Sequence, residues 1–197
     1  MRRVIAAEYV TLDGVMTDPG GVGEIEHGGW SNQYFDDELA QYQSKQLFAC
    51  DALLLGRVTF EGFAAAWPAM EETEGDFAVR MNTLPKFVAS RSLTEPLPWN
   101  GTLLEGELAE EVAALKEQPG RDLLIYGSGQ LVNALRSHNL IDEYRLMVFP
   151  VTLGDGKHLF GTGGPKSDLK LSDVKTTGSG VVLLTYETAV TPSLSGS

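Results

Sequence analysis

The chain contains few cysteines and few basic residues, and each shortage excludes a kind of site. Its 197 residues include one cysteine, Cys50, and 15 lysines and arginines against 27 acidic residues, which gives a formal net charge of −12. One cysteine excludes an internal disulfide and a cysteine-based zinc site. Nucleic acid and anionic membrane surfaces are excluded as main partners, because both require a basic face. We therefore expect no metal site, no nucleic-acid partner and no membrane partner.

Long apolar runs and internal repeats are absent as well. No run approaches the roughly 20 residues that span a bilayer, and the N-terminal MRRVIAAEYV lacks the longer apolar core and cleavage site of a secretory signal. We expect a cytoplasmic protein in a reducing compartment. The hydrophobic content of 43% suits one sizeable domain. We assign residues 1–188 to this domain and residues 189–197, which include TPSLSGS, to a flexible tail.

The most informative stretch runs from residue 121 to residue 154. Asp122 to Tyr126 is an apolar run closed by Gly127-Ser128-Gly129, which predicts a buried parallel strand followed by a tight turn. A helix should begin at Gln130, since apolar residues recur at helical spacing, and Tyr144 to Val151 should form a second buried strand. This unit places backbone N–H groups and a positive helix end at the mouth of a sheet, as phosphate sites require.

The glycines of this turn have a second interpretation, in which they only permit a sharp turn and close helix packing. The dinucleotide fingerprint of the Rossmann fold also departs from the sequence here. That fingerprint requires a third small residue where this chain has Val132, and an acidic residue at the far end of the next strand, where none is found. If a nucleotide binds here, we expect a fold other than Rossmann.

The remaining pattern alternates strands with helices and ends in a hairpin. Strands are predicted at Val4–Val10, Ala52–Leu55, Lys86–Ala89 and Thr102–Leu104, helices at Asp36–Cys50 and Glu107–Lys116, and a closing hairpin at Leu169–Val174 and Val181–Glu187. Asp18 to Gly29 is rich in glycine and acids, and we expect a mobile loop that closes over a site. Pro68 to Asn82 is predicted to be loop-like with at most one helical turn.

Two further strand ends carry a cation. Gly56-Arg57 follows one predicted strand, with Thr59 expected to cap the next helix, and Ser90-Arg91 follows another strand. Arginine at such a turn suits a phosphate better than glycine alone. The alternative is that each arginine lies on a solvated turn without a ligand.

These residues together resemble a known family. The chain is similar to the dihydrofolate reductase fold in four motifs that occur in the same order: Ile5-Ala6-Ala7, Gly56-Arg57-x-Thr59-Phe60-Glu61, Ser90-Arg91 and Ile125-Tyr126-Gly127-Ser128-Gly129-Gln130. Leu12-Asp13-Gly14 and Phe149-Pro150-Val151-x-Leu153-Gly154 look more like the reductase domain of the bifunctional riboflavin-biosynthesis deaminase-reductase and its stand-alone relatives. The resemblance implies a three-layer α/β fold with a mostly parallel central sheet and a C-terminal antiparallel hairpin.

The resemblance also implies NADPH binding at matched positions. The residues that match the family's cofactor contacts are Ala7, Gly14, Val15, Gly56, Arg57, Val58, Thr59, Ser90, Arg91, Gly127, Ser128, Gly129, Gln130 and Leu131. A hydride would pass to a small heterocyclic or carbonyl substrate that lies near the Asp18 to Gly29 loop. Trp30, Tyr34 and Phe35 are either walls of that substrate site or ordinary core residues.

Departures from the family narrow the expected chemistry. A chain with one cysteine cannot supply the zinc site of a deaminase. Folate is doubtful as a substrate, because the acids at 36–38 lie too early relative to Gly56 for a gap-free match to the catalytic carboxylate of dihydrofolate reductase. Asp13 is the predicted catalytic or substrate-orienting residue, and its alternative role is that of an Asp-Gly turn residue.

Three further expectations concern cofactor choice, assembly and alternative functions. Arg57 and Arg91 should select NADPH over NADH, because only NADPH carries a 2′-phosphate and a chain of this charge would otherwise repel it. A homodimer is expected, since relatives commonly pair and Tyr144 to Val151 is predicted near a sheet edge. The alternatives to a reductase are a non-catalytic nucleotide-binding protein of the same fold and a partner-binding domain.

Overall fold

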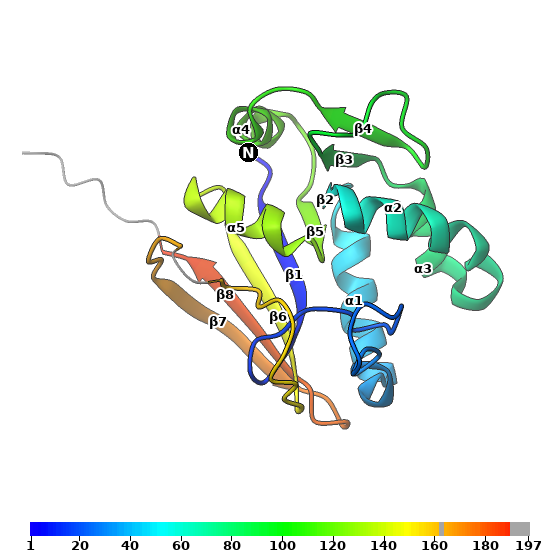
Figure 1. The fold of residues 1–197 in the computed structure, drawn as a ribbon. Helices are drawn as coiled ribbons and strands as arrows, with labels where there is room; N and C mark the ends of the chain where they lie inside the picture. Colours follow the sequence, from blue (N-terminus) through cyan, green and yellow to red (C-terminus); the bar gives the residue numbers. More distant parts are fainter. Residues whose placement is uncertain (162–163, 190–197) are drawn as a thin grey trace, which may run out of the picture.

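Eight strands form one sheet in the order β4-β3-β2-β5-β1-β6-β8-β7 (Figure 1). The structure is a computed structural model and describes residues 1–161 and 164–189. The expected tail lies outside the described residues apart from Ala189. The strands from β4 to β6 are parallel, and β8 and β7 continue the sheet antiparallel to their neighbours. The predicted mostly parallel sheet with a C-terminal antiparallel hairpin is therefore confirmed.

The elements follow one another in the predicted alternation. In chain order they are β1 (Val4–Thr11), η1 (Asn32–Tyr34), α1 (Asp37–Ala49), β2 (Ala52–Gly56), α2 (Arg57–Ala66), η2 (Trp67–Ala69), α3 (Glu71–Thr83), β3 (Lys86–Ala89), β4 (Gly101–Leu104), α4 (Leu108–Glu117), β5 (Leu123–Tyr126), α5 (Gly129–Ser137), β6 (Glu143–Phe149), β7 (Leu169–Thr176) and β8 (Val182–Thr188). Among the described helices, none is long and apolar enough to cross a membrane.

Alternate side chains of the central strands fill two separate cores. On β1, Ile5 and Ala7 face the core formed with α1, α2 and α3, whereas Val4 and Ala6 face the core formed with α4 and α5. The strand is apolar on both faces because helices cover both, as is usual for parallel sheets. The fold therefore has three layers, and the carboxyl ends of its parallel strands share one edge.

Two local predictions in the segment after β2 were wrong. Residues 71–83 form α3 where a loop was expected, as two helical pieces that meet at a kink at Gly75 (φ 54°, ψ −133°). Three acids in the first turn favour the helix dipole. The loop prediction failed because Gly75, at φ 54°, interrupts the helical pattern in the sequence. Thr59 does not cap α2, since Gly56 occupies the N-cap position and the helix begins at Arg57.

The predicted position of β6 near a sheet edge was also wrong. β6 pairs with β1 on one side and with β8 on the other, and β7 is the outer strand. The sequence could not show this, because the returning hairpin inserts its second strand, β8, between β6 and β7. Any case for a homodimer must therefore rest on a different surface.

Candidate active site

Strands β2 and β5 separate at their carboxyl ends, and the hydroxyl group of Ser128 bridges the gap between them. The two strands are in register only at Ala52 and Leu53, so they diverge toward Gly56. The Ser128 hydroxyl accepts a hydrogen bond from the Gly56 N–H at 2.8 Å and donates one to Thr59 Oγ1 at 2.9 Å. This bridge ties the Gly-Ser-Gly turn to the start of α2 at the carboxyl edge of the sheet, where open α/β sheets bind ligands.

The Gly-Ser-Gly turn has a backbone shape that selects glycine. Gly127 and Ser128 both have left-handed φ values, 60° and 61°. A Cβ on Gly129 would lie 2.4 Å from Met16 Sδ, and one on Gly127 would lie 3.2 Å from Thr59 Oγ1. The first N–H groups of α5 have no acceptor within the helix and point out of its positive end. The close contacts fit the packing interpretation. The phosphate interpretation stays a prediction, which the N–H donors at this helix end support.

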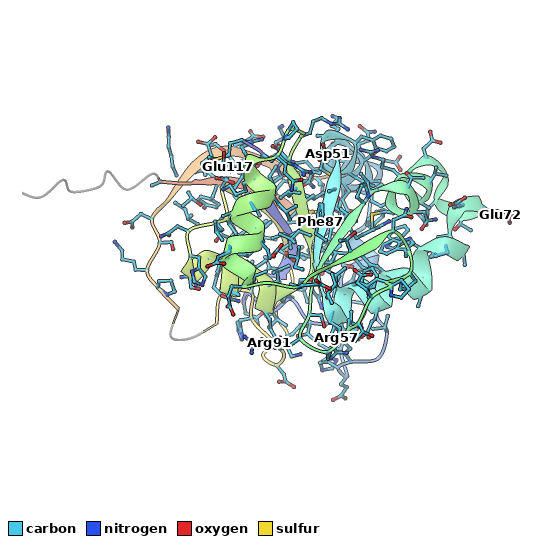
Figure 2. The ribbon with its side chains drawn as sticks, turned by 90° about the horizontal axis from the view of Figure 1, so that it is seen from above. Asp51, Arg57, Glu72, Phe87, Arg91 and Glu117 are labelled. Atoms are coloured by element: carbon cyan, nitrogen blue, oxygen red, sulfur yellow. The ribbon has the colours of Figure 1, made fainter. Side chains whose placement is uncertain are left out.

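The two cation-bearing turns lie beside each other. Gly56 pairs with Ala89 in the parallel register of β2 and β3, so Arg57 and Ser90 follow neighbouring strand ends at the same level. Figure 2 shows Arg57 and Arg91 at one edge of the molecule, opposite the edge that carries Asp51 and Glu117. The structure thus brings together the two arginines that the sequence predicted as a pair.

The side chains of these turns already have partners within the chain. Arg57 Nη1 contacts Glu61 Oε2 at 2.9 Å, one helical turn along α2, and both side chains are about half exposed. Ser90 Oγ accepts hydrogen bonds from the N–H groups of Ser92 and Leu93 at 3.1 and 3.0 Å. Arg91 is exposed to solvent. An anion that binds Arg57 must compete with Glu61. Among the described contacts, Arg91 has no ion pair that an anion would have to displace.

Several predicted cofactor residues can offer only backbone atoms. Ala7, Val15 and Leu131 are buried in the cores, with exposed fractions of 3%, 0% and 5%. Gly14 has a φ of 83°, which shapes the turn after β1. Val58 and Gln130 are exposed at the starts of α2 and α5. These predicted cofactor residues therefore share one feature, which is that their backbone atoms lie at or next to the strand ends.

Asp13 holds two distant segments together. Its carboxylate accepts a hydrogen bond from Thr11 Oγ1 at 2.5 Å and others from the N–H groups of Leu153 and Gly154 at 3.1 and 2.8 Å. These donors, the Thr11 hydroxyl first, lower the pKa of Asp13 below its ordinary value. An ionised carboxylate that accepts from several donors is suited to fixing this turn and unsuited to donating a proton near neutral pH.

The three predicted substrate-site aromatics have different surroundings. Trp30 is 5% exposed, packs edge-on against Phe149 and donates from Nε1 to the Thr17 carbonyl at 2.8 Å. Tyr34 is partly buried against the same Phe149 ring, and Phe35 is 52% exposed. Trp30 is therefore a core residue, the second of the two alternatives, whereas the Phe35 ring is free to contact a ligand.

The segment from Asp18 to Gly29 is organised around one buried carboxylate. Asp18 is 5% exposed, and its oxygens accept hydrogen bonds from the N–H groups of Val22, Gly23 and Glu24. The Gly29 N–H donates to the Asp18 carbonyl at 2.8 Å and closes the loop at its base. The predicted lid is thus held as a unit, and motion over a ligand would have to occur about its two ends.

One residue at this edge was missed by the sequence interpretation. Glu8 lies on β1 with 1% of its surface exposed, and its Oε1 has no hydrogen-bond partner among the described residues. It belongs to the sheet face covered by α5, because it pairs in register with Leu146. Burial raises the pKa of Glu8 well above its ordinary value, and the nearby Gly127 N–H opposes this only in part. The sequence signal that could have identified Glu8 is a charged residue within an apolar strand run.

Comparisons with known proteins place the chain in a family. The family model of the RibD C-terminal domain matches residues 2–183. The chain belongs to the RibD C-terminal domain family. It is 32% identical over 191 residues to the uncharacterized protein YyaP of Bacillus subtilis (strain 168), with 94% of each chain covered.

Solved structures share the fold of this RibD C-terminal domain. The diaminohydroxyphosphoribosylaminopyrimidine deaminase/5-amino-6-(5-phosphoribosylamino)uracil reductase of Thermotoga maritima superposes with a TM-score of 0.65 at 15% identity, over 95% of this chain and 57% of that one. A pyrimidine reductase-like protein of Corynebacterium diphtheriae gives a TM-score of 0.62 at 14% identity, over 95% and 92%. The predicted family and dihydrofolate reductase-like fold are confirmed, and family membership supports a reductase-like function.

Proposed function

We propose that this chain is an NADPH-dependent reductase that transfers a hydride to a small heterocyclic or carbonyl substrate. The observation that carries the proposal is the Ser128 bridge, which joins the Gly-Ser-Gly turn to the Gly56-Arg57 strand end at one edge of the sheet. Helix-end N–H groups and two arginines then lie at one edge of the sheet, as a ligand with several phosphates requires. The family supports the reaction class.

The residues at the edge divide into distinct roles. The backbone N–H groups of Gly129, Gln130 and Leu131 would hold the pyrophosphate, while Arg57 and Arg91, with Ser90, Thr59 and Val58 beside them, would bind the adenosine phosphate. The backbone of Ala7 and of the Gly14-Val15 turn would position the nicotinamide. NADPH, when bound, supplies the hydride, and the protein orients it and excludes water. The turn fits a phosphate group, because no side chain caps the N-terminus of α5 and its first N–H groups have no partner within the helix.

On the substrate side, the geometry changes the role proposed for Asp13. Its engaged carboxylate orients the turn beside the nicotinamide position and is not the proton donor. Phe35 and Tyr34 are the proposed aromatic contacts for the substrate, and Trp30 supports them from the core. The proposed substrate is a planar or carbonyl-containing hydride acceptor that is small enough to enter beneath the loop at residues 18–29.

The test is direct binding followed by turnover. Calorimetric titration of the chain with NADPH should give saturable one-site binding, and nicotinamide absorbance should fall when a panel of pterins, pyrimidines and carbonyl compounds is added. The variant Ser128→Ala, which removes the bridge, should weaken binding. Glu72→Gln is the matched control, because Glu72 is exposed on α3, away from the arginines (Figure 2). Unchanged NADPH affinity in Ser128→Ala would remove the observation that carries the proposal.

A non-catalytic NADPH-binding protein is the second candidate. The observation that favours it is the Asp13 carboxylate, which accepts hydrogen bonds from Thr11, Leu153 and Gly154 and is therefore engaged in holding the turn. Tight NADPH binding without turnover across the whole panel would favour this candidate over the reductase. A cytoplasmic location and a homodimer remain predictions.

A further inference from the structure

A buried carboxyl group lies directly behind the predicted phosphate turn. β1 and β5 are parallel neighbours in which Ala7 pairs with Tyr126, so Glu8 and Gly127 are the next residues along the two strands. The Glu8 side chain is 1% exposed, and its carboxyl group accepts a hydrogen bond from the Gly127 N–H. Glu8 therefore contacts the Gly-Ser-Gly turn from inside the protein, whereas an anion would reach the same turn from the solvent.

Glu8 has fewer hydrogen-bond partners than an ionised carboxylate needs. Its Oε1 has no partner among the described residues. Leu146, which pairs with Glu8 on β6, is apolar. Asn133 on α5 donates its amide hydrogens to the carbonyl groups of Gly129 and Leu159, at 2.8 and 2.6 Å. A carboxylate accepts through both oxygens, so the charged form of Glu8 keeps an unpaired acceptor and is poorly stabilised in the free chain.

The titratable groups on the same side of the sheet do not compensate the charge of Glu8. They are Arg136 on α5, the ion pair of Lys116 on α4 with Asp142, Tyr144 on β6, Asp13 in the turn after β1 and His158 in the segment after β6. Arg136 stacks on the Phe160 ring instead. Burial raises the pKa of Glu8 and the Gly127 N–H lowers it, and no charged group among the described residues contributes.

Two negative charges compete for the positive end of α5. This helix of nine residues has no side-chain cap, so its first N–H groups and its dipole are open to an anion. A Glu8 carboxylate behind the turn and a phosphate in front of it would both depend on these groups, and they would repel each other across the turn. A proton on Glu8 removes this repulsion. The turn therefore holds a phosphate best when Glu8 is protonated.

We propose that Glu8 takes up a proton from the solvent when NADPH binds, and that it thereby makes the affinity of the Gly-Ser-Gly turn for the cofactor dependent on pH. The inference rests on the proposed NADPH site, because the pyrophosphate supplies the second negative charge. Glu8 is a positioning residue, since it acts through the turn and does not contact the cofactor. NADPH affinity should fall as pH rises through the range in which Glu8 of the free chain loses its proton. By linkage, NADPH raises the affinity of Glu8 for that proton by the same factor.

The experiment is calorimetric titration of the full chain with NADPH across a pH series, in two buffers with different heats of ionisation. The pair of buffers gives both the Kd and the number of protons taken up. The series begins above pH ~6, where the 2′-phosphate itself titrates. Wild type should take up as much as about one proton per cofactor, and its Kd should rise by up to about tenfold per pH unit. Glu8→Gln keeps the shape of the protonated side chain and should show neither effect.

Glu72→Gln is the matched control, because it makes the same chemical change at an exposed position on α3 (Figure 2). Each variant changes the net charge from −12 to −11, so a general effect of charge would alter both equally. Glu72→Gln should keep the pH dependence of wild type. NADPH binding that is independent of pH in wild type, or equal proton uptake in wild type and Glu8→Gln, would overturn this inference and leave the proposed function standing. Absence of NADPH binding at every pH would overturn both.

An infrared measurement on wild type covers the case in which Glu8→Gln fails to fold. A protonated carboxyl group and a carboxylate absorb at different frequencies, so the difference spectrum on addition of NADPH reports the proton directly. At the pH of greatest proton uptake, NADPH should raise the carboxylic acid band and lower the carboxylate band by the equivalent of about one group. Glu72→Gln should give the same difference spectrum. A carboxylic acid band that does not rise on NADPH binding would overturn the inference.

Discussion

Glu8 is the residue at which burial and charge conflict most strongly. Its side chain lies under the Gly-Ser-Gly turn with one unpartnered oxygen, and burial raises its pKa well above the ordinary value. Between the pKa of the unfolded chain, about 4.3, and the higher pKa of the folded chain, the folded state binds more protons. The free energy of unfolding contributed by Glu8 must therefore fall as pH rises through this window.

The variant Glu8→Gln removes that pH dependence. It keeps the size of the side chain and cannot ionise, so its unfolding free energy should exceed that of wild type at pH values above the window and approach it at the acidic end. Urea unfolding across a pH series measures the difference. The exposed Glu72→Gln serves as the control and should follow wild type throughout. Parallel curves for Glu8→Gln and wild type would show that Glu8 does not titrate abnormally.

Arg57 and Arg91 should determine the choice between NADPH and NADH. A charge-assisted hydrogen bond contributes roughly 1.5–3 kcal/mol, so removing either arginine should weaken NADPH binding by roughly ten- to a hundredfold and leave NADH almost unchanged. Glu61→Gln frees Arg57 from its ion pair and should strengthen NADPH binding. Titrations with both cofactors at two salt concentrations test this, since the preference should shrink as salt rises. Equal losses for both cofactors would contradict the assignment.

At the scale of the element, α5 depends on close contact between its first residue and the turn after β1. A Cβ on Gly129 would lie 2.4 Å from Met16 Sδ. Gly129→Ala should therefore cost about 1–3 kcal/mol of stability through overpacking and displace the N–H groups of the turn. Gly62→Ala is the control in α2, where nothing lies within 4 Å of the added Cβ, and it should stabilise by about 0.5–1 kcal/mol.

A compensating change separates packing from other causes. Met16→Ala combined with Gly129→Ala should recover part of the lost stability, because the shorter side chain makes room for the Cβ. Thermal unfolding and NADPH titration of the single and double variants measure the coupling. If the stability changes of the two single variants simply add in the double variant, a clash with Met16 is not the reason that position 129 requires glycine.

The elements that sequence could predict are those whose signals are local. β5, its Gly-Ser-Gly turn and α5 carry apolar runs, glycines and helical spacing within one short stretch, and the structure has them at the predicted places within one or two residues. α3 was missed because Gly75 at positive φ interrupts its pattern. The order of β6, β8 and β7 depends on pairing between distant segments, which no local pattern encodes.

The candidate site divides in the same way. The turns at Arg57, Arg91 and Gly127 were found because each follows a strand, and parallel strands end at a common edge. The Ser128 bridge and the buried Glu8 oxygen depend on which side chains meet across that edge. Periodicity shows which face a residue occupies, but not which partner it meets there.

At the scale of the whole molecule, Asp13 joins the beginning of the chain to the segment that follows β6. Besides the bonds of Asp13 to Leu153 and Gly154, the Leu12 N–H donates to the Val151 carbonyl at 2.8 Å and the Met16 N–H to the Lys157 carbonyl at 2.9 Å. These contacts bridge about 140 positions of sequence. Because the donors lower the pKa of Asp13, its contribution to stability is present above the unfolded pKa and is lost as pH falls through the folded pKa.

Asp13→Asn distinguishes this joining role from a catalytic one. The amide keeps one acceptor oxygen and cannot satisfy all three donors, so we expect a loss of roughly 1–3 kcal/mol in unfolding free energy and the disappearance of the acid-side loss of stability. With an active substrate, KM should rise while the pH profile of kcat keeps its shape, because no proton passes through Asp13. Asp155→Asn is the control in the same segment, where the carboxylate contacts only the adjacent Gly156 N–H among the described bonds. A kcat profile that loses one limb in Asp13→Asn alone would instead make Asp13 the proton donor.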